Sequence, residues 1–396
     1  MNLRLGCAVL GIACCLAAVG CSSSGGSSAG STSAPASGTT PSSPAASASG
    51  AGSNSAVVGA AQAAVTQWEA PQPALSIPPI TKPVPKGVRL AILTCANVPS
   101  CQAETNGTAA AAEALGWSVK QYQSALTPQG YQATWASLLQ GNPTAIVYSA
   151  LFPNPNIASD LAEVKARHIP LVSISPYTID APPAAAADGA RATVAGPTMY
   201  AADGKLMADV IVADAKGAAN TLWVWDPTFS GIHGAIYNAF TQEIDAAGGT
   251  VGVLQISIAN VGQSVPSQVV SYLQQHPDIK YVAFGVSDFD AGVAPALAAA
   301  GLAQRVKIVA RAPEASNLLA VKDGQEFAEV ADENIAGGWR STDDMLRVLA
   351  GEPVDQIDPS GWHQIFVKSN VTETTQAPLT PGVPQSFLKA WNLASS

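Results

Sequence analysis

Apolar and polar residues alternate along the chain in blocks that predict strands and helices in turn. Residues 88–94 (VRLAILT) form a mostly apolar run, which is typical of a strand buried on both faces. A helical segment follows at 104–115, where Gly116 favours a helix end. The same order continues with strands at 117–123, 144–149 and 170–175 and helices at 131–139 and 156–167. Short connections in this order predict a parallel sheet with helices on both faces.

The second half of the chain repeats this alternation. Strands are predicted at 220–225, 251–257, 280–285, 305–310 and 327–331, and helices at 204–215, 232–247, 265–276, 291–300, 315–322 and 335–350. The expected fold class is therefore α/β, with two doubly wound parallel-sheet lobes and a cleft between them. Ligands of such sheets bind at the carboxyl ends of the strands, and hinge closure over a small ligand is the usual motion.

The N-terminal residues have the pattern of a targeting signal and not of a folded domain. Arg4, the apolar stretch from Leu5 to Val19 and the small residues before Cys21 predict a cleaved secretory signal at residues 1–20. A Cys at the cleavage point resembles the lipobox of bacterial lipoproteins, which implies a lipid on Cys21; an ordinary signal with an incidental Cys is the alternative. Residues 21–85 are expected to hold a Ser/Gly/Ala/Pro tether, a short helix at 56–68 and a Pro-rich strap.

Composition and charge argue against two broad classes, polytopic membrane proteins and nucleic-acid-binding proteins. Only 12% of the 396 residues are charged and 47% are hydrophobic, which raises the question of a membrane protein. Beyond the N-terminus no apolar run approaches the ~20 residues of a spanning helix, so a polytopic membrane protein is excluded. The net charge of -9 argues against a nucleic-acid partner.

The cysteines and the catalytic motifs narrow the chemistry further. Cys95 and Cys101 remain after the signal and the lipidated Cys are set aside, and an oxidising compartment favours a disulfide between them. Two buried free thiols are the alternative. No phosphate loop or nucleophile elbow is present, and the four His are scattered. We therefore expect no enzyme activity, no cofactor and no metal site.

The order of segments in the second half carries a family resemblance. Residues 284–302 (FGVSDFDAGVAPALAAAGL), then 320–324 (AVKDG) and 327–331 (FAEVA), then a helix ending at 349–352 (LAGE), resemble a type I periplasmic binding protein, the ribose-binding-like component of ABC importers. Residues 169–172 (IPLV) resemble another strand of that family. The related cytoplasmic repressors carry an N-terminal helix-turn-helix, whereas this chain begins with a signal and a tether.

The resemblance implies a discontinuous division of the chain. Lobe 1 would hold residues 86–194 and 333–361, and lobe 2 would hold residues 195–332 and 362–396, with hinge crossings between the lobes. It also implies ligand contacts from Asp288 and from Asp332, where the chain crosses back. Several sugar-gripping charges of the family are replaced here, by Ser175-Pro176, by Ile236 and by Ala312 with Arg311 beside it.

Strand-end loops supply the other candidate ligand contacts. They are Asn97, Phe152, Tyr177, Asp226, Phe229 and Phe289, and Ser175 and Arg311 at the replaced family positions are also candidates. This set predicts a cleft with more aromatic and fewer charged contacts than a simple pentose or hexose needs. Alternatives stay open: a loop aromatic could be local packing, Asp226 or Asp288 could cap a helix, and Arg311 could pair with Glu314 on the surface.

The predicted function is that of an extracytoplasmic solute-binding lipoprotein. It would be a monomer held at the cell membrane by the lipid on Cys21, and it would deliver a small-molecule solute to an ABC permease. A ligand-sensing module for a membrane receptor or kinase is the alternative from a different class. The solute is expected to be sugar-like but less polar than a simple pentose or hexose.

Overall fold

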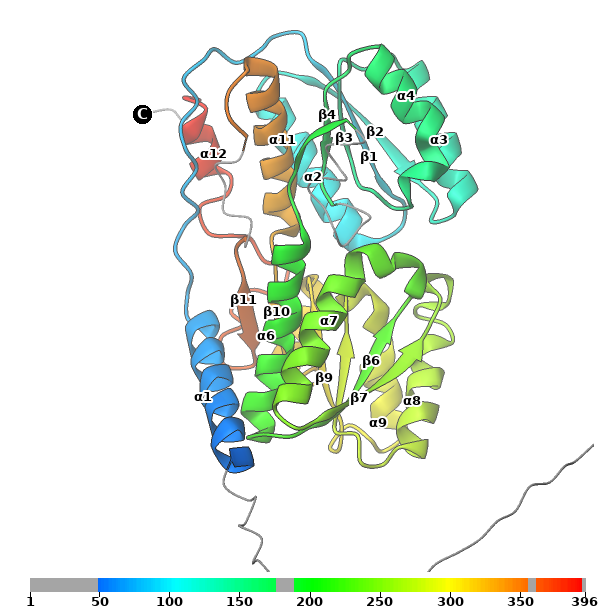
Figure 1. Cartoon of the computed structure of the whole chain (residues 1–396), viewed down its shortest axis with the longest axis vertical. Helices are drawn as coiled ribbons and strands as arrows, with labels where there is room; N and C mark the ends of the chain where they lie inside the picture. Colours follow the sequence, from blue (N-terminus) through cyan, green and yellow to red (C-terminus); the bar gives the residue numbers. More distant parts are fainter. Residues whose placement is uncertain (1–48, 176–188, 355–360, 394–396) are drawn as a thin grey trace, which may run out of the picture. The chain divides into compact units, whose positions relative to one another are not determined.

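The computed structural model describes residues 49–175, 189–354 and 361–393, all within one compact unit that begins at Ser47. Two separate β-sheets organise these residues, and helices pack on both faces of each sheet (Figure 1). We call the first sheet with its helices lobe 1 and the second lobe 2. The predicted α/β fold with two doubly wound sheets is confirmed.

Lobe 1 is built on a five-stranded parallel sheet with the order β2-β1-β3-β4-β5. Its strands are β1 (Arg89–Cys95), β2 (Ser118–Ser124), β3 (Ala145–Tyr148), β4 (Leu171–Ser173) and β5 (Ala190–Thr193). Its helices are α2 (Pro99–Ala114), α3 (Pro128–Gln140), α4 (Ala158–Ala166), α11 (Asn334–Ala350) and α12 (Gln385–Ala390), and η1 (Asn154–Ile157) is a 3₁₀ turn. Leu90 and Ile92 pack against α2 and α11, while Ala91 and Leu93 pack against α3. This alternation explains why the sequence of β1 is apolar on both faces.

Lobe 2 is built on a six-stranded sheet with the order β11-β10-β9-β8-β6-β7. Its strands are β6 (Asn220–Trp225), β7 (Thr250–Gln255), β8 (Tyr281–Phe284), β9 (Lys307–Arg311), β10 (Ala328–Ala331) and the antiparallel β11 (Gln364–Val367). Its helices are α1 (Ser49–Glu69), α6 (Pro197–Ala215), α7 (Ser230–Ala246), α8 (Val265–Gln275), α9 (Val293–Ala299) and α10 (Ala315–Asp323). Short 3₁₀ turns are η2 (Pro227–Phe229), η3 (Ile258–Asn260) and η4 (Ser287–Asp290).

The N-terminal helix and strap belong to the folded body, which corrects the boundary predicted at residue 86. Ala61 of α1 is fully buried in the core that α6 and α7 form with the second sheet. The strap then reaches lobe 1, where Ile80 is buried and its backbone N–H donates to the Ala390 carbonyl at 2.9 Å. The apolar residues of 57–80 therefore have partners that lie more than a hundred positions later in the chain.

The C-terminal residues divide between the two sheets. The sequence prediction placed all of 362–396 in lobe 2, and β11 does extend that sheet. In contrast, α12 packs on lobe 1: Trp391 stacks on Trp339 with ring centroids 5.6 Å apart and donates its Nε1–H to Asp343 at 2.6 Å. The assignment is therefore wrong for α12, which lies beside α11 (Figure 1) and whose aromatic residues belong to the core of lobe 1.

Two glycines bring α2 and α11 into direct backbone contact. A Cβ on Gly107 would lie 2.3 Å from the Ile335 carbonyl oxygen, and one on Gly338 would lie 2.4 Å from the Glu104 carbonyl oxygen. Side chains at these positions would force the helices apart. The two glycines therefore fix the position of Glu104 relative to α11.

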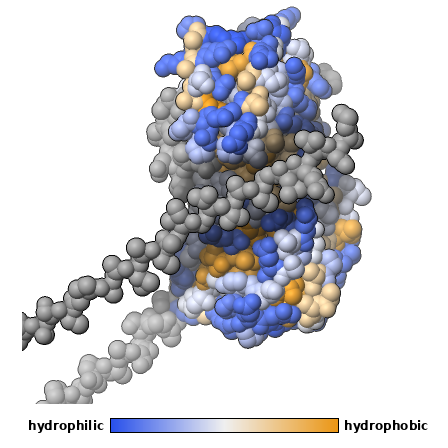
Figure 2. Space-filling view, turned by 90° about the vertical axis from the view of Figure 1, so that its right-hand side faces the viewer, coloured by the Kyte–Doolittle hydropathy of each residue, from blue (hydrophilic) through white to orange (hydrophobic). Residues whose placement is uncertain are grey.

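The surface is mostly hydrophilic on the side that Figure 2 shows, with smaller apolar patches among the polar residues. Few large hydrophobic side chains are exposed among the described residues, namely Val253, Leu319, Leu379 and Leu393. In this part of the chain, no helix combines the length and the apolar character needed to cross a bilayer.

Candidate functional site

The carboxyl ends of strands from both sheets meet at one cavity. Cys95 ends β1, and Ser149 and Ser175 follow β3 and β4 on the lobe 1 side. On the lobe 2 side, Asp288 follows β8 and Arg311 ends β9. The cavity measures about 110 Å³, several times the ~10–15 Å³ that one water requires. Parallel α/β sheets bind ligands at this end, so the cavity is the candidate site.

Apolar and aromatic side chains form much of the cavity wall. His233 of α7 lies between two aromatic rings, with its centroid 6.1 Å from that of Phe229 and 5.6 Å from that of Phe289. Leu151, Ile232, Ile258 and Val286 add aliphatic surface. Such a wall suits the less polar face of a solute.

One hydrogen bond crosses the cavity from lobe to lobe. Ser100, in the first turn of α2, donates its Oγ–H to the Asp288 carboxylate at 2.7 Å. Ser100 lies inside the loop that a disulfide between Cys95 and Cys101 closes. Both cysteines also line the cavity, so the disulfide holds the lobe 1 side of this contact.

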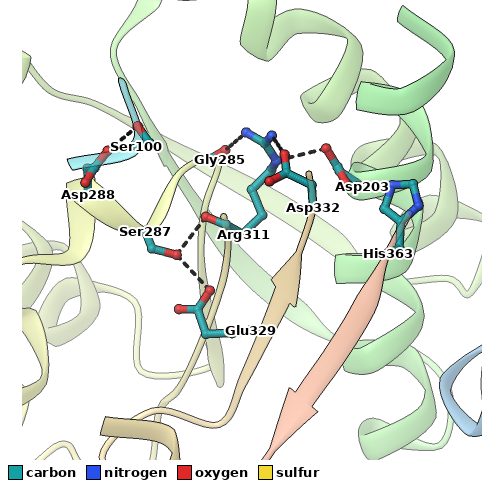
Figure 3. A network of polar contacts seen from close by, with 9 residues as sticks. All are labelled: Ser100, Asp203, Gly285, Ser287, Asp288, Arg311, Glu329, Asp332 and His363. Atoms are coloured by element: carbon teal, nitrogen blue, oxygen red, sulfur yellow. Dashed lines mark hydrogen bonds and ion pairs between the residues drawn. The ribbon is translucent and has the colours of Figure 1, made fainter. Parts of the chain in front are cut away.

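Arg311 is the centre of a buried ion-pair network (Figure 3). Its Nε lies 2.9 Å from Asp203, one terminal nitrogen pairs with Asp332, and the other donates to the Gly285 carbonyl at 3.3 Å. Asp203 in turn lies 2.9 Å from His363 Nε2. Burial alone would lower the pKa of Arg311, but Asp332 and Asp203 outweigh it and raise this pKa.

Two further titratable groups line the cavity in uncharged form. Burial, with the nearby Asp332 carboxylate, raises the pKa of Glu104 to about 8. Burial and the Arg311 charge lower the pKa of His233 to about 3. The Nδ1 atom of His233 is buried and has no hydrogen-bond partner among the described residues. At neutral pH both side chains are therefore neutral polar groups.

Three buried carboxyls lie beside this site. Oxygens of Asp290, Glu326 and Glu329 lie within 4.8 Å of one another. Ser287, in the same turn as Asp288, donates to Glu329 at 2.7 Å. Burial raises the pKa of all three carboxyls, to about 7 for Glu326, which favours shared protons between them.

A family comparison accounts for this architecture. The family described as "Periplasmic binding protein domain" matches residues 96–353, well over half of the chain. The chain belongs to the periplasmic binding protein family. Membership supports a binding role rather than catalysis. A comparison with curated proteins finds no match.

Solved structures show the same type I fold as this binding protein. A glucose-galactose binding protein from Geobacillus stearothermophilus has a TM-score of 0.61 and 16% identity, covering 73% of this chain and 100% of its own. A solute-binding protein from Agrobacterium vitis bound with α-D-tagatopyranose has a TM-score of 0.62 and 17% identity, covering 72% and 96%. One from Mycobacterium smegmatis with bound glycerol has a TM-score of 0.61 and 19% identity, covering 74% and 99%.

The cavity of this binding protein brings together half of the residues that the sequence singled out. Ser175, Phe229, Asp288, Phe289 and Arg311 line it. Asp332 lines a smaller adjoining cavity with Arg311, and Asn97 lines a larger cavity with Asp288. The suggested surface pair of Arg311 with Glu314 is wrong, because Arg311 is buried and paired with Asp203 and Asp332.

Two of the predicted residues have other roles. Phe152 packs against Tyr131 and Phe229 and does not line the cavity. Asp226 accepts hydrogen bonds from the backbone N–H groups of Thr228 and Ile258, both at 2.9 Å, so it is a loop-fixing residue. Tyr177 and Cys21 lie outside the described residues.

Residues on helix sides were missed by the sequence reasoning. They are Ser100, Glu104, Tyr200, His233 and Asn334, which all line the cavity, and Asp203, which holds Arg311. Strand-end position, the signal used for prediction, does not apply to them. For Asp203, the sequence offered one indication, which is an Asp among the apolar residues of α6.

Proposed function

We propose that this protein is an extracytoplasmic solute-binding lipoprotein that captures a small molecule between its lobes and delivers it to an ABC permease. The observation that carries the proposal is the cavity at the carboxyl ends of both sheets, which is lined from both lobes. Hinge closure of such lobes buries a solute from both sides. The Ser100–Asp288 hydrogen bond supports a closed arrangement in which the lobes touch at the site.

The wall chemistry supports a solute that is sugar-like but less polar than a simple hexose. Asp288, Ser149 and Ser175 offer groups for hydroxyls, whereas Phe229 and Phe289 offer an apolar face. Carboxylates bind hydroxyl donors through charge-assisted hydrogen bonds, which fix orientation. The ligands bound in the related structures, such as α-D-tagatopyranose and glycerol, are a starting set for screening.

The test is a thermal-shift screen of the full chain followed by calorimetric titration. The panel holds glucose, galactose, tagatose, allitol, glycerol and aromatic glycosides of the same sugars. A solute at 100 times its Kd stabilises by about 2.7 kcal/mol, which is visible as a rise in Tm. We expect Asp288→Ala to weaken binding at least about tenfold, or ~1.4 kcal/mol.

The matched control is Asp323→Ala, which changes an exposed carboxylate on α10 of the same lobe. Full affinity in the Asp288→Ala protein would show that the site is assigned wrongly. No Tm rise with any member of the panel would count against solute capture itself. For the anchor, Cys21→Ala should release the protein from the membrane fraction, and retention would refute lipidation there.

A further inference from the structure

Glu104 is a carboxyl on the cavity wall with two other carboxylates nearby. It lies on α2 at the cavity wall, and its backbone is held against Gly338 of α11 by the close helix contact. The charged groups that act on it are Asp332 beyond β10, Asp288 of η4 and Arg311 of β9. Two of these three are carboxylates, so an ionised Glu104 would face like charges.

Arg311, the one cation among these groups, is already paired with other residues. Arg311 uses all three of its nitrogens on Asp203, Asp332 and the Gly285 carbonyl. His233, the other basic group on the cavity wall, is held neutral by burial, which lowers its pKa to about 3. No described lining group therefore supplies a free positive charge to Glu104.

Neutral partners around Glu104 are also few. The Ser149 hydroxyl of lobe 1 donates to its carboxylate at 3.4 Å, a long contact. Tyr200 of α6 and Asn334 of α11 complete the polar wall. Taking a carboxylate out of water costs free energy that one long hydrogen bond offsets little, so the protonated form is favoured in this position. Burial, with Asp332, accordingly raises the pKa of Glu104 to about 8.

We infer that Glu104 is a specificity-determining residue of the cleft, acting as an uncharged carboxylic acid that donates a hydrogen bond to an acceptor oxygen of an uncharged solute. This inference rests on the proposed function and narrows its solute class. Anionic solutes such as sugar acids or sugar phosphates meet no free cation here, and they face Asp288. Binding should then require the proton on Glu104.

The proton requirement fixes the direction of the pH dependence. Only the protonated fraction binds, so the apparent Kd rises as that fraction falls. For a pKa of about 8, the fraction is about nine tenths at pH 7 and about one tenth at pH 9. We therefore expect the apparent Kd to increase roughly tenfold between pH 7 and pH 9.

The first measurement needs no solute. Carbon-13 NMR of the full chain, labelled at the Glu side-chain carboxyl, should show one signal that titrates near pH 8 and disappears in Glu104→Gln. Glu113→Gln is the matched control, because Glu113 is exposed on the same helix. Titration of the Glu104 signal in the ordinary range of ~4–5 would overturn the inference.

The second measurement uses galactose and galacturonate, which share a ring and differ in charge, together with any panel member that raises Tm. Wild type should bind the neutral sugar about tenfold more weakly at pH 9 than at pH 7. Glu104→Gln, which keeps a donor but cannot ionise, should lose this pH dependence. Glu104→Leu should bind at least about tenfold more weakly than wild type at pH 7.

The outcomes separate this inference from the proposed function. A Kd that is constant from pH 6 to pH 9, or galacturonate bound as tightly as galactose, would refute the role of Glu104 while leaving solute capture intact. Failure of every panel member to bind at any pH would instead count against the proposed function, and the NMR titration would still report the state of Glu104.

Discussion

At the scale of single residues, Arg311 shows how the same side chain can carry a different role from the one its position suggests. Its place at the end of β9 predicted a ligand contact, and it does line the cavity. Its guanidinium nevertheless joins α6, β8 and the end of β10 through Asp203, Gly285 and Asp332. Arg311 thus positions the strand ends that form the wall of the site.

The first prediction concerns this network. Arg311→Met should destabilise the protein by about 3–5 kcal/mol, because it leaves Asp332 buried without its ion-pair partner and leaves Asp203 with His363 alone. Urea denaturation of the full chain measures the loss. Lys307→Met is the control in the same strand: its pair with Asp214 is partly exposed and should cost at most ~1 kcal/mol. Equal stability of the two variants would contradict the prediction.

At the scale of elements, the sequence predicted those that carry a clear apolar pattern of their own. The apolar alternation of residues 88–94 is that of β1, whose faces pack on α2 and α3 nearby. The short β11 and α12 were not predicted, because the residues that they contact are remote in the chain. Gln364 of β11 donates to the Trp68 carbonyl, and Trp391 after α12 donates to Asp343. No local pattern encodes such contacts.

The residues of the site also fall into a group that the sequence predicts and a group that depends on tertiary contacts. Strand ends meet at one edge of a parallel sheet, so Asp288, Phe289 and Arg311 could be predicted together. Glu104 and His233 lie on helices, where only the rotation of the helix against its neighbours decides which side chain reaches the cavity. That rotation depends on contacts such as Gly107 and Gly338 at the α2–α11 crossing, which are tertiary.

The second prediction concerns α1, which overlaps the short helix predicted at 56–68 but was expected to precede the folded body. Ala61→Asp places a charge in the fully buried contact between α1 and lobe 2, so α1 should detach. We expect a stability loss on the order of 2 kcal/mol or more and faster amide hydrogen exchange across residues 54–69. Ala60→Asp is the matched control, since Ala60 is exposed. Unchanged exchange in Ala61→Asp would show that α1 is not docked.

At the scale of the whole molecule, segments outside the expected hinges also join the two lobes. The strap links α1 on lobe 2 to lobe 1, where Glu352 accepts hydrogen bonds from the Thr81 and Lys82 backbone N–H groups at 2.7 and 2.8 Å. The tail returns from β11 on lobe 2 to α12 on lobe 1. In the proposed hinge motion, opening of the cleft would therefore bend the strap and the tail as well as the hinge crossings.

The last prediction concerns the pH dependence of stability that arises from the buried carboxyl of Glu326 beside the cleft. The pKa of Glu326 is raised by burial to about 7, close to Glu329 and Asp290. Above the ordinary pKa of ~4.5 the unfolded chain has released this proton while the native protein still binds it. The unfolded state then binds fewer protons, so the stability from this group is complete below pH ~4.5 and is lost as the pH rises to about 7.

Urea denaturation at pH 5, 6 and 7 compares wild type with Glu326→Gln, whose amide can still donate to Glu329. Because the amide cannot titrate, the decline in stability should be shallower in the variant by up to ~1.4 kcal/mol per pH unit. His233 acts in the opposite sense below pH ~6.5, since its pKa is lowered, but it does so in both proteins and cancels. Glu113→Gln should follow wild type, and parallel profiles for wild type and Glu326→Gln would mean that the buried carboxyls ionise normally.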